Sequence, residues 1–256
     1  MITRELTAAY TIWLREMKKF VRAKSRILGN VAVPFFFLAF LGVGINSSFT
    51  LTGNLEGISY LEFLTPGIIA MTLLFSSMFA GISILWDRQF GFLKEILVAP
   101  VSRFSIIIGR VLAGMTTGVI QAMVVLAISL LLGVPIYNVF GVLISFVFIL
   151  LISMSFVSLG IAFASRMNDM QGFQLIMNFI IFPVWMLSGA FFPLDGVPGW
   201  LLTLSYLDPL TYGVDGLRLS LIGVSHFPWI LSVGVLAVFS VVMISLGAYL
   251  FSKTEV

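Results

Sequence analysis

The sequence predicts an all-α membrane protein with six transmembrane helices, an N-terminal amphipathic interfacial helix, and short extracellular or re-entrant helices between spans five and six. Of the 256 residues, 60% are hydrophobic and 10% are charged, against roughly 25% charged residues in soluble domains. So little polar surface requires a bilayer as the main solvent, and a bilayer requires helices that satisfy their own backbone. We expect a single membrane domain over residues 1–256, with 1–26 as the cytoplasmic interfacial helix and 27–256 as the six-span bundle.

Hydrophobic runs long enough to cross about 30 Å of hydrocarbon define the six spans. They are Ile27–Ile45, Leu64–Trp86, Ile106–Leu132, Val139–Ala164, Leu175–Phe192 and Phe227–Phe251. The fifth run is short and contains Pro183. Because proline has no backbone N–H to donate, we expect a kink in that helix.

Lysine and arginine predict the orientation, because positively charged loops resist translocation. Of the 14 such residues, all except Arg218 fall on one side of the predicted bundle. We therefore expect a plasma or inner membrane protein with both termini in the cytoplasm. The long basic start without a small-x-small cleavage site favours an uncleaved anchor over a signal peptide. The same charge distribution favours a role in topology and gives no support to a nucleic-acid partner.

The segment before the first span is amphipathic, with apolar residues at helical spacing opposite a basic face. The apolar residues are Leu6, Tyr10, Trp13, Leu14, Met17 and Phe20 or Val21, and the basic ones are Arg15, Lys18, Lys19 and Arg22. This pattern fits an anchor in anionic membrane lipids. An added role as a docking surface for a cytoplasmic partner is an open alternative.

The cytoplasmic connection from Trp86 to Arg103 alternates charged and bulky apolar residues. We expect a short helix ended by Pro100, with one apolar side. That side contains Phe92, Leu93, Ile96 and Leu97. It either packs against the spans and lipid head groups, or it transmits force from a soluble partner.

The segment from Pro193 to His226 lies outside the fifth span yet is rich in Leu, Trp and Tyr. Asp208 followed by Pro209 is a helix start signal, and Gly223 can end the helix. Such a helix would be about 20 Å long, too short to cross, so it must dip into the membrane or lie flat. Asp215 and Arg218 lie three residues apart and can form a local ion pair or an interfacial anchor.

These last two segments, at these places among six spans, resemble the ABC-2 family of ABC exporter permeases, particularly its drug-resistance and nodulation-factor branch. The resemblance rests on the runs Val197-Pro198-Gly199-Trp200-Leu201, Leu207-Asp208-Pro209-Leu210-Thr211-Tyr212-Gly213-Val214-Asp215-Gly216-Leu217-Arg218 and Ala99-Pro100-Val101-Ser102-Arg103. The sequence departs from the family at Asp208, where asparagine is commoner, and at Gln89-Phe90, where a more charged pair is usual. The resemblance places a signature segment at Pro209, Tyr212, Asp215 and Arg218. It also implies a coupling segment at Arg88, Gly91, Leu93, Glu95, Ile96 and Leu97.

The resemblance implies half of a transporter, in which two permeases, here expected as a homodimer, each bind a cytoplasmic ATPase subunit and export a substrate. No glycine precedes a lysine, as the phosphate-binding motif GxxxxGK[ST] requires. We therefore expect no cofactor on this chain, ATP and Mg on the partner subunit, and a transport subunit in place of an enzyme. Neither a metal site nor catalytic residues are expected, since cysteine is absent and His226 is the one histidine.

Two alternatives to this function stay open, one within the class and one outside it. A lipid-linked glycan exporter would use the same kind of permease. A secondary carrier is disfavoured because the middle of the spans contains no acidic residue or lysine.

Two spans contain polar stripes at helical spacing, which either bond helices together or line a path. They comprise Thr65, Thr72, Ser76 and Ser83 on the second span, and Gln171, Gln174, Asn178 and Trp185 on the fifth. In the resembling family these two spans line the path. We therefore expect the substrate pathway at Thr72, Ser76, Phe79, Gln174, Asn178, Phe182 and Trp185. Uncharged walls with adaptable Met and Phe surfaces suit an amphipathic or hydrophobic substrate.

Overall fold

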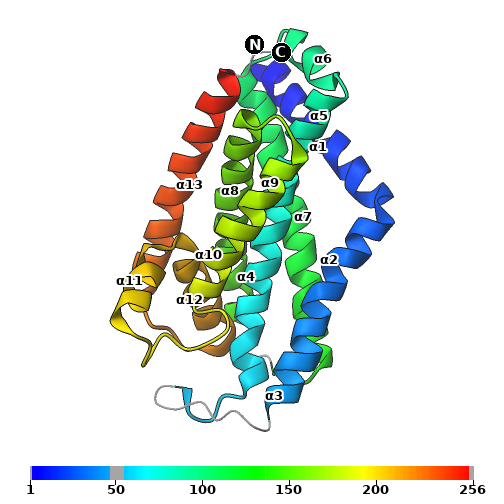
Figure 1. Ribbon diagram of the computed structural model, residues 1–256. Helices are drawn as coiled ribbons and strands as arrows, with labels where there is room; N and C mark the ends of the chain where they lie inside the picture. Colours follow the sequence, from blue (N-terminus) through cyan, green and yellow to red (C-terminus); the bar gives the residue numbers. More distant parts are fainter. Residues whose placement is uncertain (1, 47–54, 136, 254–256) are drawn as a thin grey trace.

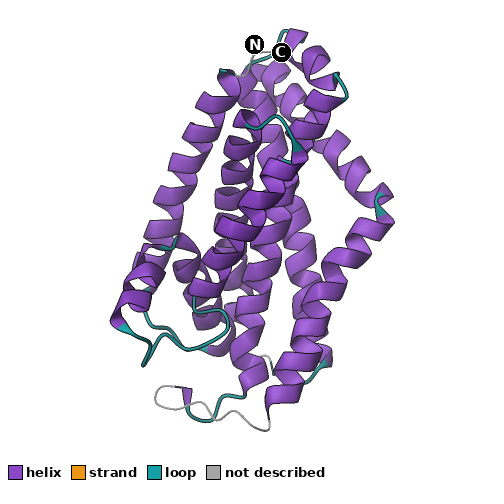
Figure 2. Cartoon of the chain, viewed as in Figure 1, coloured by secondary structure: helices purple, strands orange, loops and turns teal. Residues whose placement is uncertain are grey.

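The computed structural model describes residues 2–46, 55–135 and 137–253, and these are almost entirely helical, with no strand among them (Figures 1 and 2). Part of the predicted Asn46–Glu62 connection, residues 47–54, lies outside the described residues. The helices in chain order are α1 (Ile2–Arg22), α2 (Lys24–Phe36), η1 (Phe37–Val43), α3 (Gly44–Asn46), α4 (Tyr60–Gly81), α5 (Ser83–Gln89), α6 (Phe92–Val98), α7 (Arg103–Leu131), α8 (Val139–Arg166), α9 (Met170–Ile176), η3 (Met177–Ile181), α10 (Phe182–Leu187), α11 (Gly199–Leu207), α12 (Pro209–Ile222) and α13 (Trp229–Ser252).

Among the described residues, five helical stretches are long and apolar enough to cross a membrane. They are Tyr60–Gln89, Arg103–Leu131, Val139–Arg166, Met170–Leu187 and Trp229–Ser252. A sixth candidate is the pair Thr3–Arg22 and Ile27–Val43, whose axes meet at 67°. The all-α membrane fold is thus confirmed, and the bend agrees with an interfacial helix followed by a first span.

Helix α4 lies at the centre of the bundle and packs against η1, α7, α8 and α12 (Figure 1). Small residues permit these close contacts, as is common between membrane helices. A methyl group added at Gly81 would come within 2.3 Å of the backbone of Gly160, so α4 and α8 cross with their backbones nearly touching. The side chains of α4 are buried along most of its length, which makes it the axis of the fold.

The two ends of the bundle are formed by different elements. Both termini, α1 and α6 lie at one end, which we call the terminus end, while the α11–α12 hairpin lies at the other, the hairpin end (Figure 1). Loops are confined to these ends and to the breaks between consecutive helices (Figure 2). The arrangement places the predicted coupling segment and the predicted signature segment at opposite ends of the helical bundle.

The fifth span differs from the sequence prediction in its bounds and its regularity. It begins at Met170, ahead of the predicted Leu175, because the Asp169 carboxylate accepts a hydrogen bond from the Gly172 N–H at 2.6 Å and caps the helix. The irregularity expected at Pro183 takes the form of the π-helical segment η3 immediately before it. A second π-helical segment, η1, follows Pro34 in the first span.

Candidate coupling surface and transport pathway

The turn between α5 and α6 depends on a glycine. Gly91 has φ of +79°, a left-handed conformation in which a side chain is strained. No atom lies within 4 Å of where a Cβ would be, so backbone conformation alone favours glycine here. Gly91 thereby turns the chain at the end of the long α4–α5 helix and sets the direction of α6.

Arg88 anchors this turn to the end of helix α8. Its guanidinium donates hydrogen bonds to the carbonyl oxygens of Met167 at 2.6 Å and Ser165 at 3.1 Å, and to Asn168 Oδ1 at 3.2 Å. The last carbonyls of a helix lack partners within the helix and carry a partial negative charge, so an arginine is well matched to them. Arg88 therefore ties α5 to α8 and faces inward.

Among the described side chains of α6 and the turn before it, some apolar residues are buried and others are exposed. Leu93 is fully buried, whereas Phe90, Phe92 and Val98 are 73%, 53% and 83% exposed. The expectation that Phe92 shares one side with Leu93 and Ile96 is wrong, because Leu93 and Ile96 pack against the core whereas Phe92 points outward. Ile96 is half-buried, Glu95 and Gly91 are exposed, and the side chain of Leu97 lies outside the described part.

Helix α1 packs across α7 and meets the far end of the coupling segment. The Glu5 carboxylate accepts hydrogen bonds from the Ser105 and Ser102 hydroxyls, both at 2.7 Å, and from the Ser102 N–H. These bonds, led by that of Ser105, lower the pKa of Glu5 to about 2. Glu5 is therefore ionised at neutral pH and links α1 to the start of α7.

An open groove of about 640 Å³ separates α1 from α6, and we call it the α1–α6 groove. One wall is polar and belongs to α1, with Thr3, Arg4, Thr7 and Thr11, while the other is apolar, with Ile96, Ala99, Val101 and Ile106. The groove and the exposed residues of α6 together give the terminus end a surface with both apolar and cationic character.

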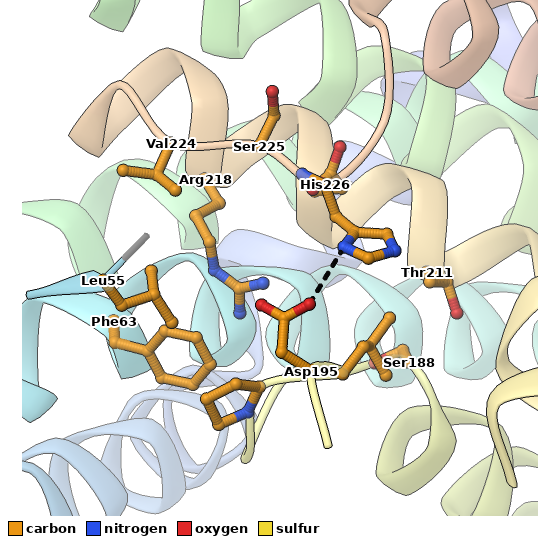
Figure 3. Close-up of a pocket in the computed structure, with 12 residues that line it drawn as sticks. Leu55, Phe63, Ser188, Asp195, Thr211, Arg218, Val224, Ser225 and His226 are labelled. Atoms are coloured by element: carbon orange, nitrogen blue, oxygen red, sulfur yellow. Dashed lines mark hydrogen bonds and ion pairs between the residues drawn. The ribbon is translucent and has the colours of Figure 1, made fainter. Parts of the chain in front are cut away.

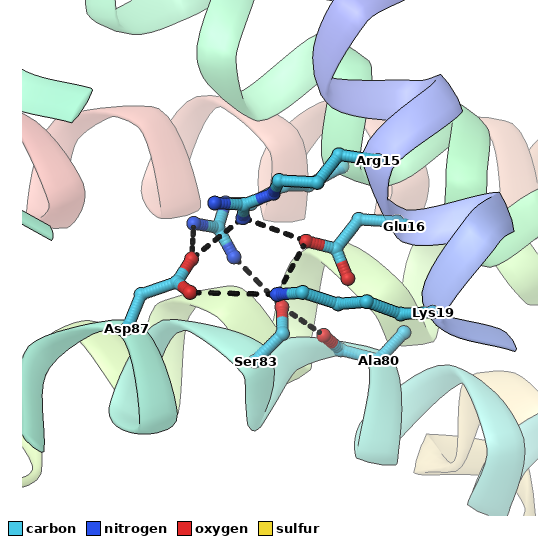
Figure 4. A network of polar contacts seen from close by, with 7 residues as sticks. Arg15, Glu16, Lys19, Ala80, Ser83 and Asp87 are labelled. Carbon is cyan, nitrogen blue, oxygen red and sulfur yellow. Dashed lines mark hydrogen bonds and ion pairs between the residues drawn. The ribbon is translucent and has the colours of Figure 1, made fainter. Parts of the chain in front are cut away.

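A cluster of charged side chains joins α1, α5 and α7 near this groove (Figure 4). Asp87 accepts hydrogen bonds from Arg15 at 2.7 Å and from Arg110 at 2.6 Å, and Lys19 lies 3.5 Å away. Glu16 pairs with Arg15 and Lys19. Arg110 and Asp87 are buried, with side chains 2% and 4% exposed. This charge cluster, Arg15, Glu16, Lys19, Asp87 and Arg110, fixes the interfacial helix to the base of the coupling segment.

Most predicted pathway residues line one hollow of about 250 Å³ between α2, α4 and α10. It is lined by Thr72, Ser76, Phe79, Phe182 and Trp185, joined by Phe37, Phe75 and Gln121, and we call it the pathway hollow. Its walls are almost wholly apolar, since the Thr72 and Ser76 hydroxyls bond to carbonyls of their own helix.

The indole of Trp185 anchors one wall of the pathway hollow. Its Nε1–H donates to the Gly67 carbonyl at 3.3 Å, and its ring contacts Phe37, Phe75, Phe182 and Phe191. The side chain is 1% exposed. Trp185 therefore holds α10 against α4 and leaves only its edge to the hollow.

Gln174 and Asn178 do not line the pathway hollow. Both are exposed, and the Gln174 amide donates to Asn178 Oδ1 at 3.2 Å. The predicted stripe assumed 3.6 residues per turn from Gln171 to Trp185. The π-helical segment Met177–Ile181 adds residues to one turn and rotates Trp185 away from the two amides.

The hairpin end is built around α12, whose predicted bounds are confirmed. Asp208 caps it by accepting from the Leu210 N–H at 2.8 Å, Pro209 opens it, and Gly223 ends it at φ of +77°. At nine residues and 14 residues, α11 and α12 are both too short to cross a bilayer. The hairpin therefore enters the bundle at this end without crossing it.

Asp215 and Arg218 have separate partners in place of the local ion pair, which was one of the two expectations for them. Asp215 accepts hydrogen bonds from the N–H groups of His226 at 2.6 Å and Phe227 at 3.1 Å, ahead of α13. Arg218 donates to the Gly189 carbonyl at 2.9 Å, and its guanidinium lies 4.1 Å from the centre of the Phe63 ring. These signature residues thus join α12 to the helices on both sides of it.

Tyr212, the remaining signature residue with a polar side chain, donates to the carbonyl of Tyr206 at 3.0 Å. Its bond closes the α11–α12 corner.

A small hollow of about 100 Å³ lies beside the hairpin and is lined by Asp195, His226, Asp215 and Arg218 (Figure 3). The imidazole Nδ1 of His226 lies 3.5 Å from Asp195 Oδ1 across it.

The bundle, with its apolar spans and a hairpin inserted at one end, defines a multi-pass membrane protein. The chain belongs to the ABC-2 type transporter family, which matches residues 7–222. It is 30% identical over 240 residues to the inner membrane transport permease YadH of Escherichia coli K12, covering 91% of this chain and 90% of YadH. It is 27% identical over 244 residues to nodulation protein J of Rhizobium leguminosarum bv. viciae, covering 90% and 88%. A putative transport permease, ycf38 of Cyanophora paradoxa, is 28% identical over 217 residues, covering 83% and 73%.

Proposed function

We propose that this ABC-2 permease is the membrane subunit of an exporter that moves an amphipathic or hydrophobic substrate outward. ATP and Mg bind a separate cytoplasmic nucleotide-binding subunit, and two permeases form a homodimer around the path, because one chain supplies only half of it. The observation that carries the proposal is that apolar side chains are exposed on α6 and in the turn before it, at Phe90, Phe92 and Val98. We call these three residues the docking surface.

The docking surface is connected to the pathway hollow through α5 and α4. Helices α4 and α5 form one long stretch, Tyr60–Gln89, which carries Thr72 and Ser76 in its middle and Arg88 near its end. A force applied at α6 therefore reaches the hollow through a continuous helix and, by way of Arg88, through α8. We propose this connection as the lever that couples the docking surface to the pathway hollow.

Changing Phe90, Phe92 and Val98 together to serine tests this assignment. Loss of their exposed apolar area is expected to reduce copurification of the co-expressed nucleotide-binding subunit about tenfold and to abolish export. The measurement is permease-bound ATP hydrolysis after affinity purification, together with transport. Leu93 is unsuitable as a target because it is fully buried and its truncation would test folding.

The matched control changes Trp200 and Leu207, which are equally exposed but lie on α11 at the hairpin end. Serine at these two positions should leave copurification unchanged. Unchanged copurification and unchanged export in the triple α6 variant would overturn the docking assignment and leave α6 as a structural corner.

We also propose that the terminus end faces the cytoplasm, as the lysine and arginine distribution favours. The natural chain is free of cysteine, so single cysteines can be introduced without background. Gly199→Cys at the start of α11 should react with an impermeant thiol reagent in intact cells, and Gln89→Cys should react only after the membrane is opened. Both positions are exposed, and Gly199 has open space around it. The reverse pattern would invert the orientation.

A further inference from the structure

A second hollow of about 310 Å³ continues the pathway hollow toward the terminus end. It lies between α1, α4 and α7 and shares Ser76, Phe79 and Gln121 with the pathway hollow. Unlike the pathway hollow, it has charged residues in its wall, namely Glu16, Lys19 and Arg110. We call it the basic hollow, and the two together form one elongated cavity with a charged end and an apolar end.

The charged end has more cationic than anionic groups. The charge cluster contains three cations and two carboxylates, which leaves one net positive charge (Figure 4). Asp87 is engaged at short distance by Arg15 and Arg110, whereas Lys19 is 3.5 Å from either carboxylate. Lys19 is also half-exposed, and its two ion pairs are longer than those of the arginines to Asp87.

The same cluster has hydrogen-bond donors to spare. The buried Nε atoms of Arg15 and Arg110 have no hydrogen-bond partner among the described residues. Arg110 lines the basic hollow and is itself almost wholly buried. The Nε atom of Arg110 has almost no accessible surface in this structure, so an anionic acceptor in the basic hollow reaches it only after the side chain moves.

The other end of the cavity is suited to an alkyl or aromatic tail. Phe37, Phe75 and Phe182 surround the pathway hollow, and the hydroxyls there are already bonded to their own helix. No charged residue lines this end among the described residues. The cavity therefore changes from cationic to apolar along its length.

We propose that this cavity binds a membrane-resident amphiphile with an anionic head group, placed at Lys19 and Arg110, and a tail along the pathway hollow. The proposal rests on the proposed export function and names its substrate class. A cationic amphiphile would meet like charge at the head position, and a neutral one would leave the donors unmatched. Together the two hollows reach the size range of ligand sites, roughly 300–1,000 Å³.

Trp185 serves as a probe of the tail site. In a variant that keeps Trp185 and replaces Trp13, Trp86, Trp200 and Trp229 with Phe, its fluorescence reports contact with a bromine-bearing tail. Because Trp185 is 1% exposed, bulk lipid quenches it weakly. In phosphatidylcholine nanodiscs, brominated phosphatidylglycerol should half-quench Trp185 at a mole fraction about fivefold lower than phosphatidylcholine with the same brominated tails.

The head contact is tested by Lys19→Gln, with Lys18→Gln on the neighbouring exposed position as the matched control. Lys19→Gln should raise the half-quenching mole fraction of phosphatidylglycerol about threefold, and Lys18→Gln should leave it unchanged. Equal quenching by the two lipids, stronger quenching by a cationic lipid with the same tails, or equal effects of the two variants would overturn the proposal.

A substrate is distinguished from a resident lipid by adding the nucleotide-binding subunit and ATP. Turnover should relieve the quenching by phosphatidylglycerol if the amphiphile is exported, and quenching that persists during ATP hydrolysis would overturn its assignment as substrate. The binding measurement needs no ATPase partner. Failure of copurification would therefore refute the exporter assignment and leave the binding result intact. Absence of selective quenching would refute the binding proposal and leave the exporter assignment intact.

Discussion

Replacing Asp87 with asparagine is expected to lower the free energy of unfolding by about 3–5 kcal/mol, the range seen when one partner of a buried ion pair is removed. Arg110 is 2% exposed and donates to Asp87 at 2.6 Å, so it would lose its only carboxylate contact among the described residues. Arg15 would keep Glu16 as a partner. The charge cluster would change from one net positive charge to two.

The measurement is the thermal unfolding midpoint of the purified full chain, with Glu95→Gln as the control. Glu95 is an exposed carboxylate on α6, and its neutralisation should shift the midpoint little. The double change Asp87→Asn with Arg110→Gln should recover part of the loss, because it removes the unmatched buried charge as well. An Asp87→Asn midpoint equal to that of the Glu95→Gln control would contradict a structural role for the cluster.

Features that depend on composition and local signals could be predicted from the sequence. Apolar length predicts the spans, and the bounds of α12 follow from Asp208, Pro209 and Gly223, each of which acts within a few residues of itself. The start of the fifth span was missed although Asp169 is a capping residue of the same kind. The cap lies ahead of the apolar run that begins at Leu175, so the run alone places the helix start too late.

Features that depend on the rotation of one helix relative to another could not be predicted. The stripe from Gln174 to Trp185 is divided between two faces, because a π-helical turn, which carries no sequence motif of its own, changes the register between them. Leu93 and Phe92 are equally apolar, and only the direction of α6 after Gly91 decides which is buried.

The charge cluster was missed for a related reason. Arg15, Asp87 and Arg110 are far apart in sequence, and each has an adequate local interpretation as an interfacial or snorkelling residue. The available signal was an acidic residue at the end of one apolar span and an arginine within another, Asp87 and Arg110. Charges in such places need a partner, and each could have been assigned to the other.

Replacing Arg88 with methionine is expected to uncouple ATP hydrolysis from export. Methionine keeps much of the side-chain length but loses the hydrogen bonds to Met167, Ser165 and Asn168 and the cation at the end of α8. A cation at a partly buried helix C-terminus contributes up to about 2 kcal/mol, and charge-assisted hydrogen bonds about 1.5–3 kcal/mol each. Without these bonds, motion of the α5–α6 corner would no longer be transmitted to α8.

The expected result is a loss of export of at least about tenfold, which corresponds to 1.4 kcal/mol of coupling, while the nucleotide-binding subunit still copurifies and hydrolyses ATP. Copurification is preserved because Arg88 faces α8, away from the docking surface. Export by Arg88→Lys should lie between that of the unchanged protein and that of Arg88→Met. An ammonium keeps the charge but lacks the planar fork that bonds several carbonyls at once. Arg166→Gln is the matched control, because it removes an exposed cation from the last turn of α8. If Arg88→Met reduced copurification as strongly as the triple α6 variant, Arg88 would belong to the docking surface and not to the lever behind it.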